Sequence, residues 1–402
     1  MTYDVGALRA EIPALLSGVA HFDGPGGTQT PARVAGAIAD VLTGPLSIRG
    51  SLTPGEVNAE GLVQGFRQAV ADLVGGHPSG VVFGRSATQL TYDVSRTLAK
   101  DWAPGDEVVV SRLDHDANIR PWIQAAERAG AQVRWADFDP ETGELPPSAV
   151  GDLLSERTRL VAVTAASNLI GTVPDVAAIS GLVHRYPRAL LHVDGVHYAA
   201  HAFVDLGRLG ADFFVCSPYK FLGPHHGVLT ASPELLERLR PDKLLPSTDA
   251  VPERFELGTL PYELLAGTTA AIDFLAGLGG DGTGGRRERL RSAFAAIERH
   301  EGALRERLEE GLAALPGVTV RSRAADRTPT LLLTFDDRDA AAACAFLAAR
   351  GVHAPAGSFY ALEASRHLGL GDTGGLRVGL SPYNDEGDVE RLLEGLASFV
   401  RS

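Results

Sequence analysis

The sequence predicts an α/β protein with a mostly parallel central sheet and helices on both faces. Between about residues 80 and 230, short apolar runs, broken by Gly, Pro or charged residues, alternate with helical patterns. The expected strands are Val81–Phe83, Val108–Ser111, Leu160–Thr164, Leu190–Val193, Phe213–Cys216 and Val228–Thr230. The expected helices are Gln89–Lys100, Pro121–Ala129 and Val176–Tyr186. Ligands of such sheets bind beyond the carboxyl ends of the strands, so the loops there are expected to form the site.

The rest of the chain predicts a smaller α+β domain. A long amphipathic helix is expected over Arg286–Leu315, and the elements after it are strands Val318–Arg321, Thr330–Phe335 and Leu376–Leu380, a helix through Arg350 and a closing helix Asp385–Val400. We therefore divide the chain into an N-terminal segment packing with the small domain (1–20), a large domain (21–280) and a small domain (281–402). The glycine-rich stretch Gly277–Gly285 follows a helical pattern rather than a strand, which favours a linker over an NAD-binding loop.

Composition disfavours several function classes. The chain has 402 residues and a net charge of −13, whereas nucleic-acid and anionic-membrane partners favour a basic face. Its apolar runs are shorter than the roughly 20 residues that a membrane span needs. The N-terminus lacks the pattern of a signal peptide. Cys216 and Cys344 are too few for a disulfide framework or a cysteine-rich zinc site, so we expect a cytoplasmic protein.

Lys220 is the first candidate for chemistry. The chain has 37 basic residues, yet only Lys100, Lys220 and Lys243 are lysines. Arginine cannot form an imine with an aldehyde, whereas a deprotonated lysine can. Lys220 ends an apolar run, where burial would favour the neutral amine. The alternative is an ordinary surface lysine at a strand end.

Asp194 and the turn 84–89 offer contacts to a flat, phosphorylated group. Asp194 ends an apolar run, and its carboxylate could keep a proton on a pyridine nitrogen or simply cap the next turn. His197 could donate to a ring hydroxyl or be a packed histidine. The turn 84–89 precedes a helix, whose free N–H groups and dipole attract phosphate, although Ser and Thr there also serve as plain caps.

Three further polar side chains complete the set. His115 could stack on a flat aromatic ligand, and Asn168 is an uncharged donor at another strand end. Arg377, in the second domain, could bind a carboxylate through two parallel hydrogen bonds or be a solvated arginine. Asp114 and Asp116 flank His115, but three adjacent residues make poor joint ligands, so no metal site is predicted.

The chain resembles the class V aminotransferase family, in particular its cysteine desulfurase-like (SufS-like) branch. The resemblance rests on colinear segments over nearly the whole chain: FDGPGGTQTP, GRSATQ, HDANIRPW, SNLIGT, VDGVHYA, CSPYKFLGPHHG, FELGT and LRVGLSPYN. It implies fold-type I, with a seven-stranded sheet in the large domain, and pyridoxal 5′-phosphate (PLP) as cofactor. It also implies a small amino acid as substrate and a homodimer with active sites at the subunit interface.

The resemblance also implies residue roles. Lys220 matches the lysine that holds PLP as a Schiff base, Asp194 the partner of the pyridine nitrogen, and His115 the stacking histidine. Tyr219 stands where desulfurases usually have a histidine. Cofactor contacts are further implied for Ala87, Thr88, Asn168, His197, Ser217, Tyr219 and, from the neighbouring subunit, Thr259; substrate contacts are implied for Arg377, Asn168 and, more weakly, Arg49.

One departure from the family pattern bears on the reaction. Desulfurases carry a mobile cysteine ahead of the final strand, whereas the matching stretch here, HAPAGSFYALEASRHLG, contains none. The usual thiolate nucleophile is therefore missing, which disfavours persulfide chemistry of the standard kind. Reaction through an external aldimine then favours elimination at Cβ, with C–S or C–Se cleavage, while transamination and epimerisation stay open. A non-catalytic PLP-fold binding protein is the alternative of another class.

Overall fold

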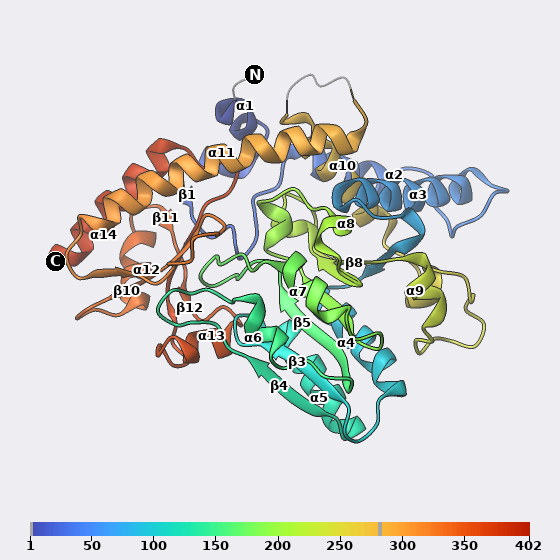
Figure 1. Ribbon diagram of the computed structural model, residues 1–402. Coiled ribbons are helices and arrows are strands. Elements are labelled where there is room, and N and C mark those ends of the chain that lie inside the picture. The colour runs from blue at the N-terminus through green and yellow to red at the C-terminus, as the bar shows by residue number, and fades with distance from the viewer. Residues whose placement is uncertain (1–2, 280–283) are drawn as a thin grey trace.

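The computed structural model describes residues 3–279 and 284–402, and its centre is a seven-stranded sheet (Figure 1). The strand order is β2-β8-β7-β6-β5-β3-β4, and every neighbouring pair is parallel except those that β8 makes with β2 and β7. The predicted α/β class and mostly parallel sheet are thereby confirmed. The strands are β2 (Val81–Gly84), β3 (Glu107–Ser111), β4 (Gln132–Ala136), β5 (Thr158–Thr164), β6 (Leu190–Asp194), β7 (Phe213–Cys216) and β8 (Gly227–Ala231).

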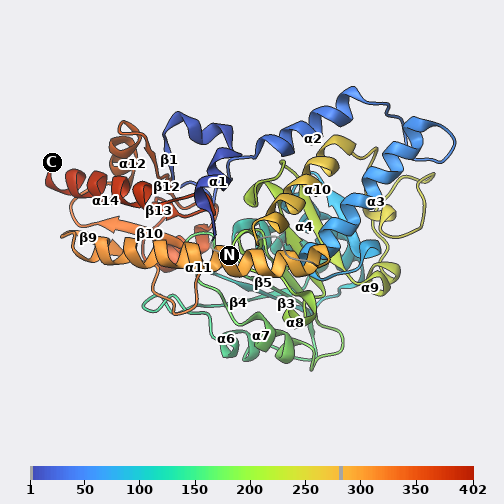
Figure 2. The ribbon, with the colours of Figure 1, turned by 90° about the horizontal axis from the view of Figure 1, so that it is seen from above.

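Helices cover both faces of this sheet because its strands are apolar on both sides (Figure 2). Val108 and Val110 of β3 pack in the same cluster as Leu90 of α4 and Trp122 of α5, whereas Val109 joins the cluster on the other face. The helices of this part are α2 (Ala32–Thr43), α3 (Pro54–Val74), α4 (Ala87–Leu98), α5 (Arg120–Ala129), α6 (Pro147–Gly151), α7 (Val176–Val183), α8 (Leu206–Leu209), α9 (Pro233–Arg238) and α10 (Tyr262–Gly277).

A second, four-stranded antiparallel sheet has the order β12-β13-β10-β9, and β1 pairs separately with β11. The predicted strands and helices of this part form close to their expected bounds. The strands are β1 (Ala20–His21), β9 (Val318–Val320), β10 (Thr330–Phe335), β11 (Val352–His353), β12 (Ala356–Gly357) and β13 (Gly375–Gly379). The helices are α1 (Val5–Ala10), α11 (Arg286–Ala313), α12 (Ala340–Ala348), α13 (Leu362–His367) and α14 (Glu386–Arg401).

The long helix α11 joins the two sheets, as Figure 1 shows along the upper edge of the molecule. Leu290 and Phe294, in its first half, belong to the core under the central sheet. Leu304, Leu308 and Leu312, in its second half, belong to the core of the second sheet. Because a single helix packs into both cores, it holds the two sheets in a fixed position relative to each other.

The N-terminal segment contacts the C-terminal part of the chain. The Tyr3 hydroxyl donates to the carbonyl of Pro382 at 2.8 Å, and Arg9 pairs with Asp388 at 2.9 Å. The division into segments 1–20, 21–280 and 281–402 stays a proposal. The glycine-rich stretch follows helix α10 and precedes α11, but its residues 280–283 lie outside the described residues. No helix in the described part of the chain is long and apolar enough to cross a bilayer.

We expect Gly195→Ala to destabilise the fold, because a Cβ at this position would lie 2.0 Å from Cζ of the buried Phe214 ring. Overpacking of this kind costs about 1–3 kcal/mol or more. The matched control is Gly181→Ala on the exposed face of α7, where no atom lies within 4 Å of the added Cβ and a gain of about 0.5–1 kcal/mol is expected. Thermal unfolding measures both variants; a Gly195→Ala protein as stable as the parent contradicts the packing.

Candidate active site

A cavity of about 660 Å³ opens where β3, β5, β6 and β7 end, and Phe359, Tyr360 and Arg377 of the second sheet region line it as well. It is the place that a doubly wound sheet offers to ligands. Ten of the twelve predicted site residues line it: Ala87, Thr88, His115, Asn168, Asp194, His197, Ser217, Tyr219, Lys220 and Arg377.

Lys220 and Asp194 lie at the ends of neighbouring strands and are both buried. Lys220 follows β7 in a single turn of 3-10 helix, and its Nζ donates to the carbonyl of Pro25. Burial, reinforced by the charge of Arg377, lowers the pKa of Lys220 to about 7. Burial raises the pKa of Asp194 to about 6, although its Oδ1 accepts from the Val196 N–H at 2.9 Å. The amine is therefore poised to lose its proton near neutral pH.

The turn before α4 forms an anion cradle. Ser86 caps the helix by accepting from the Gln89 N–H at 3.1 Å, so the helix begins two residues earlier than predicted. No hydrogen bond within the described chain uses the N–H groups of Ala87 or Thr88, as expected in a first helical turn. Gly227 of β8 lets the strand approach this turn, since its Cβ would lie 2.3 Å from the carbonyl carbon of Ser86. The arrangement suits a phosphate.

Two histidines face the cavity in neutral form. His115 accepts from the Ala117 N–H through Nδ1 at 3.0 Å, and burial, with the charges of Lys220 and Arg377, lowers its pKa to about 4. Burial also holds the pKa of His197 well below its usual value. Its Nε2 lies 3.0 Å from the hydroxyl of Thr328, while its Nδ1 is buried without a partner among the described residues. This Nδ1 can serve a polar group bound in the cavity.

Arg377 of β13 is a buried cation, only 2% exposed. Its Nη1 donates to the carbonyl of Asn168 at 2.9 Å, and its guanidinium stacks 3.7 Å above the Phe359 ring. It forms no ion pair with a carboxylate of the described residues, and burial, partly opposed by the charge of Asp23, lowers its pKa to about 9. Asn168 donates to the carbonyl of Phe359 at 2.9 Å, and its Oδ1 has no partner there. A buried guanidinium without a counter-ion is suited to bind a carboxylate.

Arg49 and Thr259 do not line the cavity of their own chain. Arg49 pairs with Glu60 at 2.8 Å and with Glu253 at 2.9 Å, so its charge is already compensated. Thr259 is exposed and lies in the loop before α10. Their roles toward substrate and phosphate stay predictions.

Several lining residues were not among the predicted ones. Asp116 and Arg120 belong to the segment HDANIRPW, whose other members were noted, and Pro25 to FDGPGGTQTP. Phe359 and Tyr360 come from a loop of the second sheet region, and both have positive φ, 52° and 58°. Sequence signals existed for the first three, since the segments themselves stood out. A left-handed Phe-Tyr pair has no such signal, because neither residue favours that conformation.

Neither cysteine lines the cavity. Cys216 is buried in β7, where burial raises its pKa to about 12. Cys344 lies on α12 and packs against the second core. A thiol with its pKa raised in this way carries almost no thiolate at neutral pH.

The fold and the cavity together define an enzyme site for a flat, phosphorylated aldehyde. A family model described as Aminotransferase class-V matches residues 20–392. An uncharacterized protein of Mycobacterium tuberculosis is 34% identical over 99% of this chain and 100% of its own length, and a probable cysteine desulfurase of Pseudomonas aeruginosa is 32% identical over 96% of each. The crystal structure of the cysteine desulfurase CsdA from Escherichia coli matches with a TM-score of 0.87 and 25% identity, covering 100% of this chain and 99% of that one.

The chain therefore belongs to the class V aminotransferase family and is a PLP-dependent enzyme of fold-type I. The free N–H groups of Ala87 and Thr88, the unpartnered Nδ1 of His197 and the low-pKa amine of Lys220 fit the phosphate, a ring substituent and the aldehyde of PLP.

We expect PLP to load onto the apo-protein at a rate that rises about tenfold per pH unit below pH 7 and then levels off, because only neutral Lys220 attacks the aldehyde. An unperturbed lysine would give a rise that continues to about pH 10. Stopped-flow absorbance measures the rate; Lys220→Ala removes the signal, and Lys243→Ala is the matched control. A rate that still climbs steeply above pH 9 contradicts the shifted pKa.

Proposed function

We propose that this enzyme catalyses elimination at Cβ of a small amino acid, with cleavage of a C–S or C–Se bond. The observation that carries the proposal is Arg377, a buried guanidinium without a carboxylate partner in the described chain, in the same cavity as Lys220. A free amino acid supplies the missing carboxylate. The amino acid must be small, because the cofactor occupies part of the 660 Å³.

The proposed roles follow from the positions of the side chains. PLP, when bound, supplies an electron sink for the bond broken at Cα. Asp194 would hold the proton on the ring nitrogen, and His115 would cover one face of the ring. Lys220, neutral near pH 7, removes the Cα proton. Arg377 and Asn168 bind the carboxylate and thereby fix which Cα bond lies ready to break.

Elimination needs no protein thiolate, which agrees with the position of both cysteines outside the cavity. With cysteine as substrate, the proton leaves Cα, the C–S bond breaks, and sulfide takes up a proton. Hydrolysis of the remaining enamine then gives pyruvate and ammonia. The balance is cysteine plus water giving pyruvate, ammonia and hydrogen sulfide, with no oxidant or reductant.

Product analysis tests the proposed reaction against transamination and epimerisation, which share the Cα proton transfer. The holoenzyme is incubated with cysteine, selenocysteine, cysteine sulfinate and alanine, each with and without a keto-acid acceptor. We expect sulfide or selenide together with an equal amount of pyruvate, independent of the acceptor. Alanine together with protein-bound sulfur, a new amino acid that appears only with the acceptor, or loss of optical purity each contradicts elimination.

We expect Arg377→Gln to raise KM for the amino acid by about 100-fold, since a buried two-bond contact to a carboxylate is lost. PLP should still load, with a pH dependence shifted upward because the charge of Arg377 no longer lowers the pKa of Lys220, and Arg377→Lys should recover part of the affinity. Arg366→Gln is the matched control, because Arg366 is exposed and pairs with Asp372. An Arg377→Gln enzyme with an unchanged KM overturns this assignment of the substrate carboxylate.

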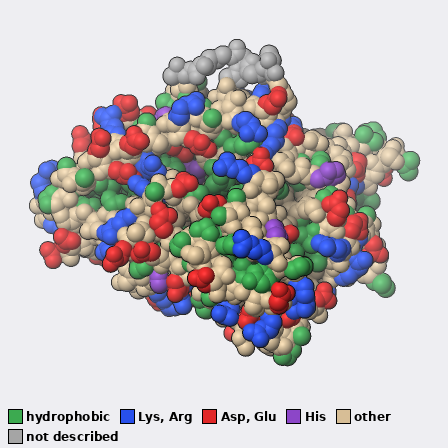
Figure 3. Space-filling model, in the orientation of Figure 1, with side chains coloured by type: hydrophobic (Ala, Val, Ile, Leu, Met, Phe, Trp, Pro, Cys, Tyr) green, Lys and Arg blue, Asp and Glu red, His purple; other side chains and the backbone are tan. Residues whose placement is uncertain are grey.

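We also propose a homodimer in a reducing cytoplasm. The α2–α3 hairpin projects from one end of the molecule, and Figure 3 shows apolar side chains on that end. Arg49 lies in this hairpin and its ion pair with Glu253 reaches the segment before α10 that carries Thr259. A second copy packed there would cover the apolar side chains and bring both residues toward its own cavity. The exposed apolar residues of the α2–α3 hairpin and of the segment between α9 and α10 are Leu42, Leu46, Ile48, Leu52, Val57, Leu244, Leu245 and Leu257.

A further inference from the structure

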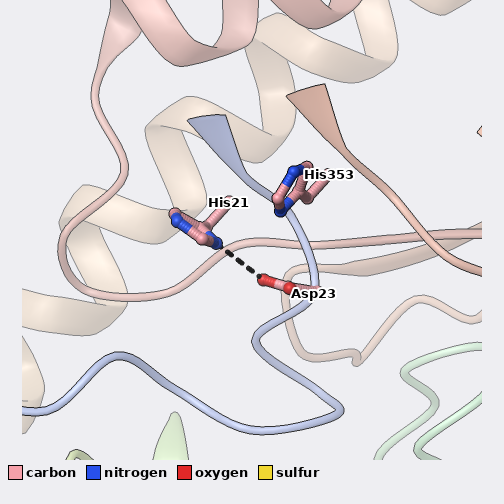
Figure 4. Close-up of side chains that lie close together, drawn as sticks. All are labelled: His21, Asp23 and His353. Carbon is pink, nitrogen blue, oxygen red and sulfur yellow. Dashed lines mark ion pairs between the residues drawn. The ribbon is translucent and has the colours of Figure 1, made fainter. Parts of the chain in front are cut away.

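We propose that His21, Asp23 and His353 form a binding site for a divalent transition-metal ion, with Zn²⁺ as the expected occupant. One ligand atom from each residue lies within 4.8 Å of the other two. Figure 4 shows a ring nitrogen of each histidine turned toward the Asp23 carboxylate. These residues lie outside the set that lines the PLP cavity, so the inference does not rest on the proposed reaction.

Strand pairing brings the three residues together from opposite ends of the chain. β1 and β11 are parallel, with His21 directly opposite His353, and the two ring centroids are 5.2 Å apart. Asp23 follows His21 by two residues in extended chain, which places it on the same face. A bridge to Gly379 holds the backbone of Asp23 in place. The three side chains are therefore preorganised by backbone contacts.

The contact between His21 and Asp23 has the spacing of metal ligands. Nδ1 of His21 lies 3.3 Å from Oδ1 of Asp23, but Oδ1 is buried without a hydrogen bond. Two ligands bound at about 2.0 Å to a tetrahedral ion lie about 3.3 Å apart. The Gln29 side-chain nitrogen lies 3.4 Å from the same Nδ1 and so borders the cluster. A cation bound between Nδ1 and Oδ1 would give this buried carboxylate oxygen the partner that it lacks among the described residues.

The donor set selects the class of ion. Two imidazoles and one carboxylate suit Zn²⁺ and its first-row neighbours, whereas Mg²⁺ and Ca²⁺ prefer oxygen ligands. Three protein ligands leave a position for water. A bound ion would fasten β1 to β11 and hold the following segment, whose Pro25 and Gly26 line the PLP cavity.

The test uses tag-free, PLP-loaded protein freed of metal by chelation. Calorimetric titration with Zn²⁺ should show one ion bound per chain, and Co²⁺ should give the visible absorbance of a tetrahedral site. His353→Ala should weaken Zn²⁺ binding by at least about tenfold. His184→Ala is the matched control and should bind as the parent does, because His184 lies outside this cluster and contacts Asp212 at 3.0 Å and the Ser180 hydroxyl at 3.1 Å.

Two results of the Zn²⁺ titration would contradict the proposed metal site. Binding weaker than about 100 µM, or binding that His353→Ala leaves unchanged, overturns the site, since an adventitious surface ion would behave in that way. Asp23→Asn provides a second variant if His353→Ala does not fold, and it too should lose at least about tenfold in affinity. Zn²⁺ affinity is read without any turnover, so failure here leaves the proposed elimination reaction untouched, and the reverse also holds.

Discussion

The structure depends on keeping three ionisable groups, Lys220, Asp194 and Arg377, away from water in one cavity. Burial is the largest cause of each pKa shift: it lowers the pKa of the amine and the guanidinium and raises that of the carboxyl. The mutual attraction of Lys220 and Asp194 only partly opposes burial. The result is an amine that can be neutral near pH 7, as its proposed role as a base requires.

This desolvated cavity exists because two sheets share it. The central sheet supplies Lys220 and Asp194 at neighbouring strand ends, and β13 supplies Arg377 from the second sheet. The hydrogen bond from Arg377 to the carbonyl of Asn168 crosses between them. Helix α11 packs into both cores and so maintains this approach. In the proposed assignment, substrate selection would depend on this contact between sheets, whereas cofactor binding would depend mainly on the central sheet.

The elements that sequence patterns predicted are those whose burial is complete. β5, β6 and β7 are buried along nearly their whole length, and their apolar runs were found within one or two residues. The edge strand β4 was missed, because Gln132 and Arg134 face solvent and interrupt the apolar run. The two-residue strands β1 and β11 have too few residues for any period, so their pairing, and with it the His21–His353 contact, is visible only in three dimensions.

The site residues also differ in how well the sequence alone predicts them. Strand-end residues such as Lys220 and Asp194 could be found because a polar side chain after an apolar run is a local signal. For Arg377 the family resemblance was the stronger signal, because the residues that surround it in the cavity lie far away in the sequence. Arg49 and Thr259 lie outside the cavity of their own chain, and no single-chain pattern encodes what a second copy would bring.

The loop that carries Phe359 and Tyr360 connects this geometry to the proposed chemistry. It belongs to the stretch where the family resemblance places a mobile cysteine, yet here its conformation is held by the large domain. The Phe359 carbonyl accepts from Asn168 and the Tyr360 carbonyl from the Asp116 N–H at 2.7 Å. These contacts offset the left-handed backbone, which costs of order 1–3 kcal/mol for residues of this kind. A loop fixed in this way is suited to shape the cavity wall, and because it bears no thiol, the proposed elimination would release sulfur as a small free product.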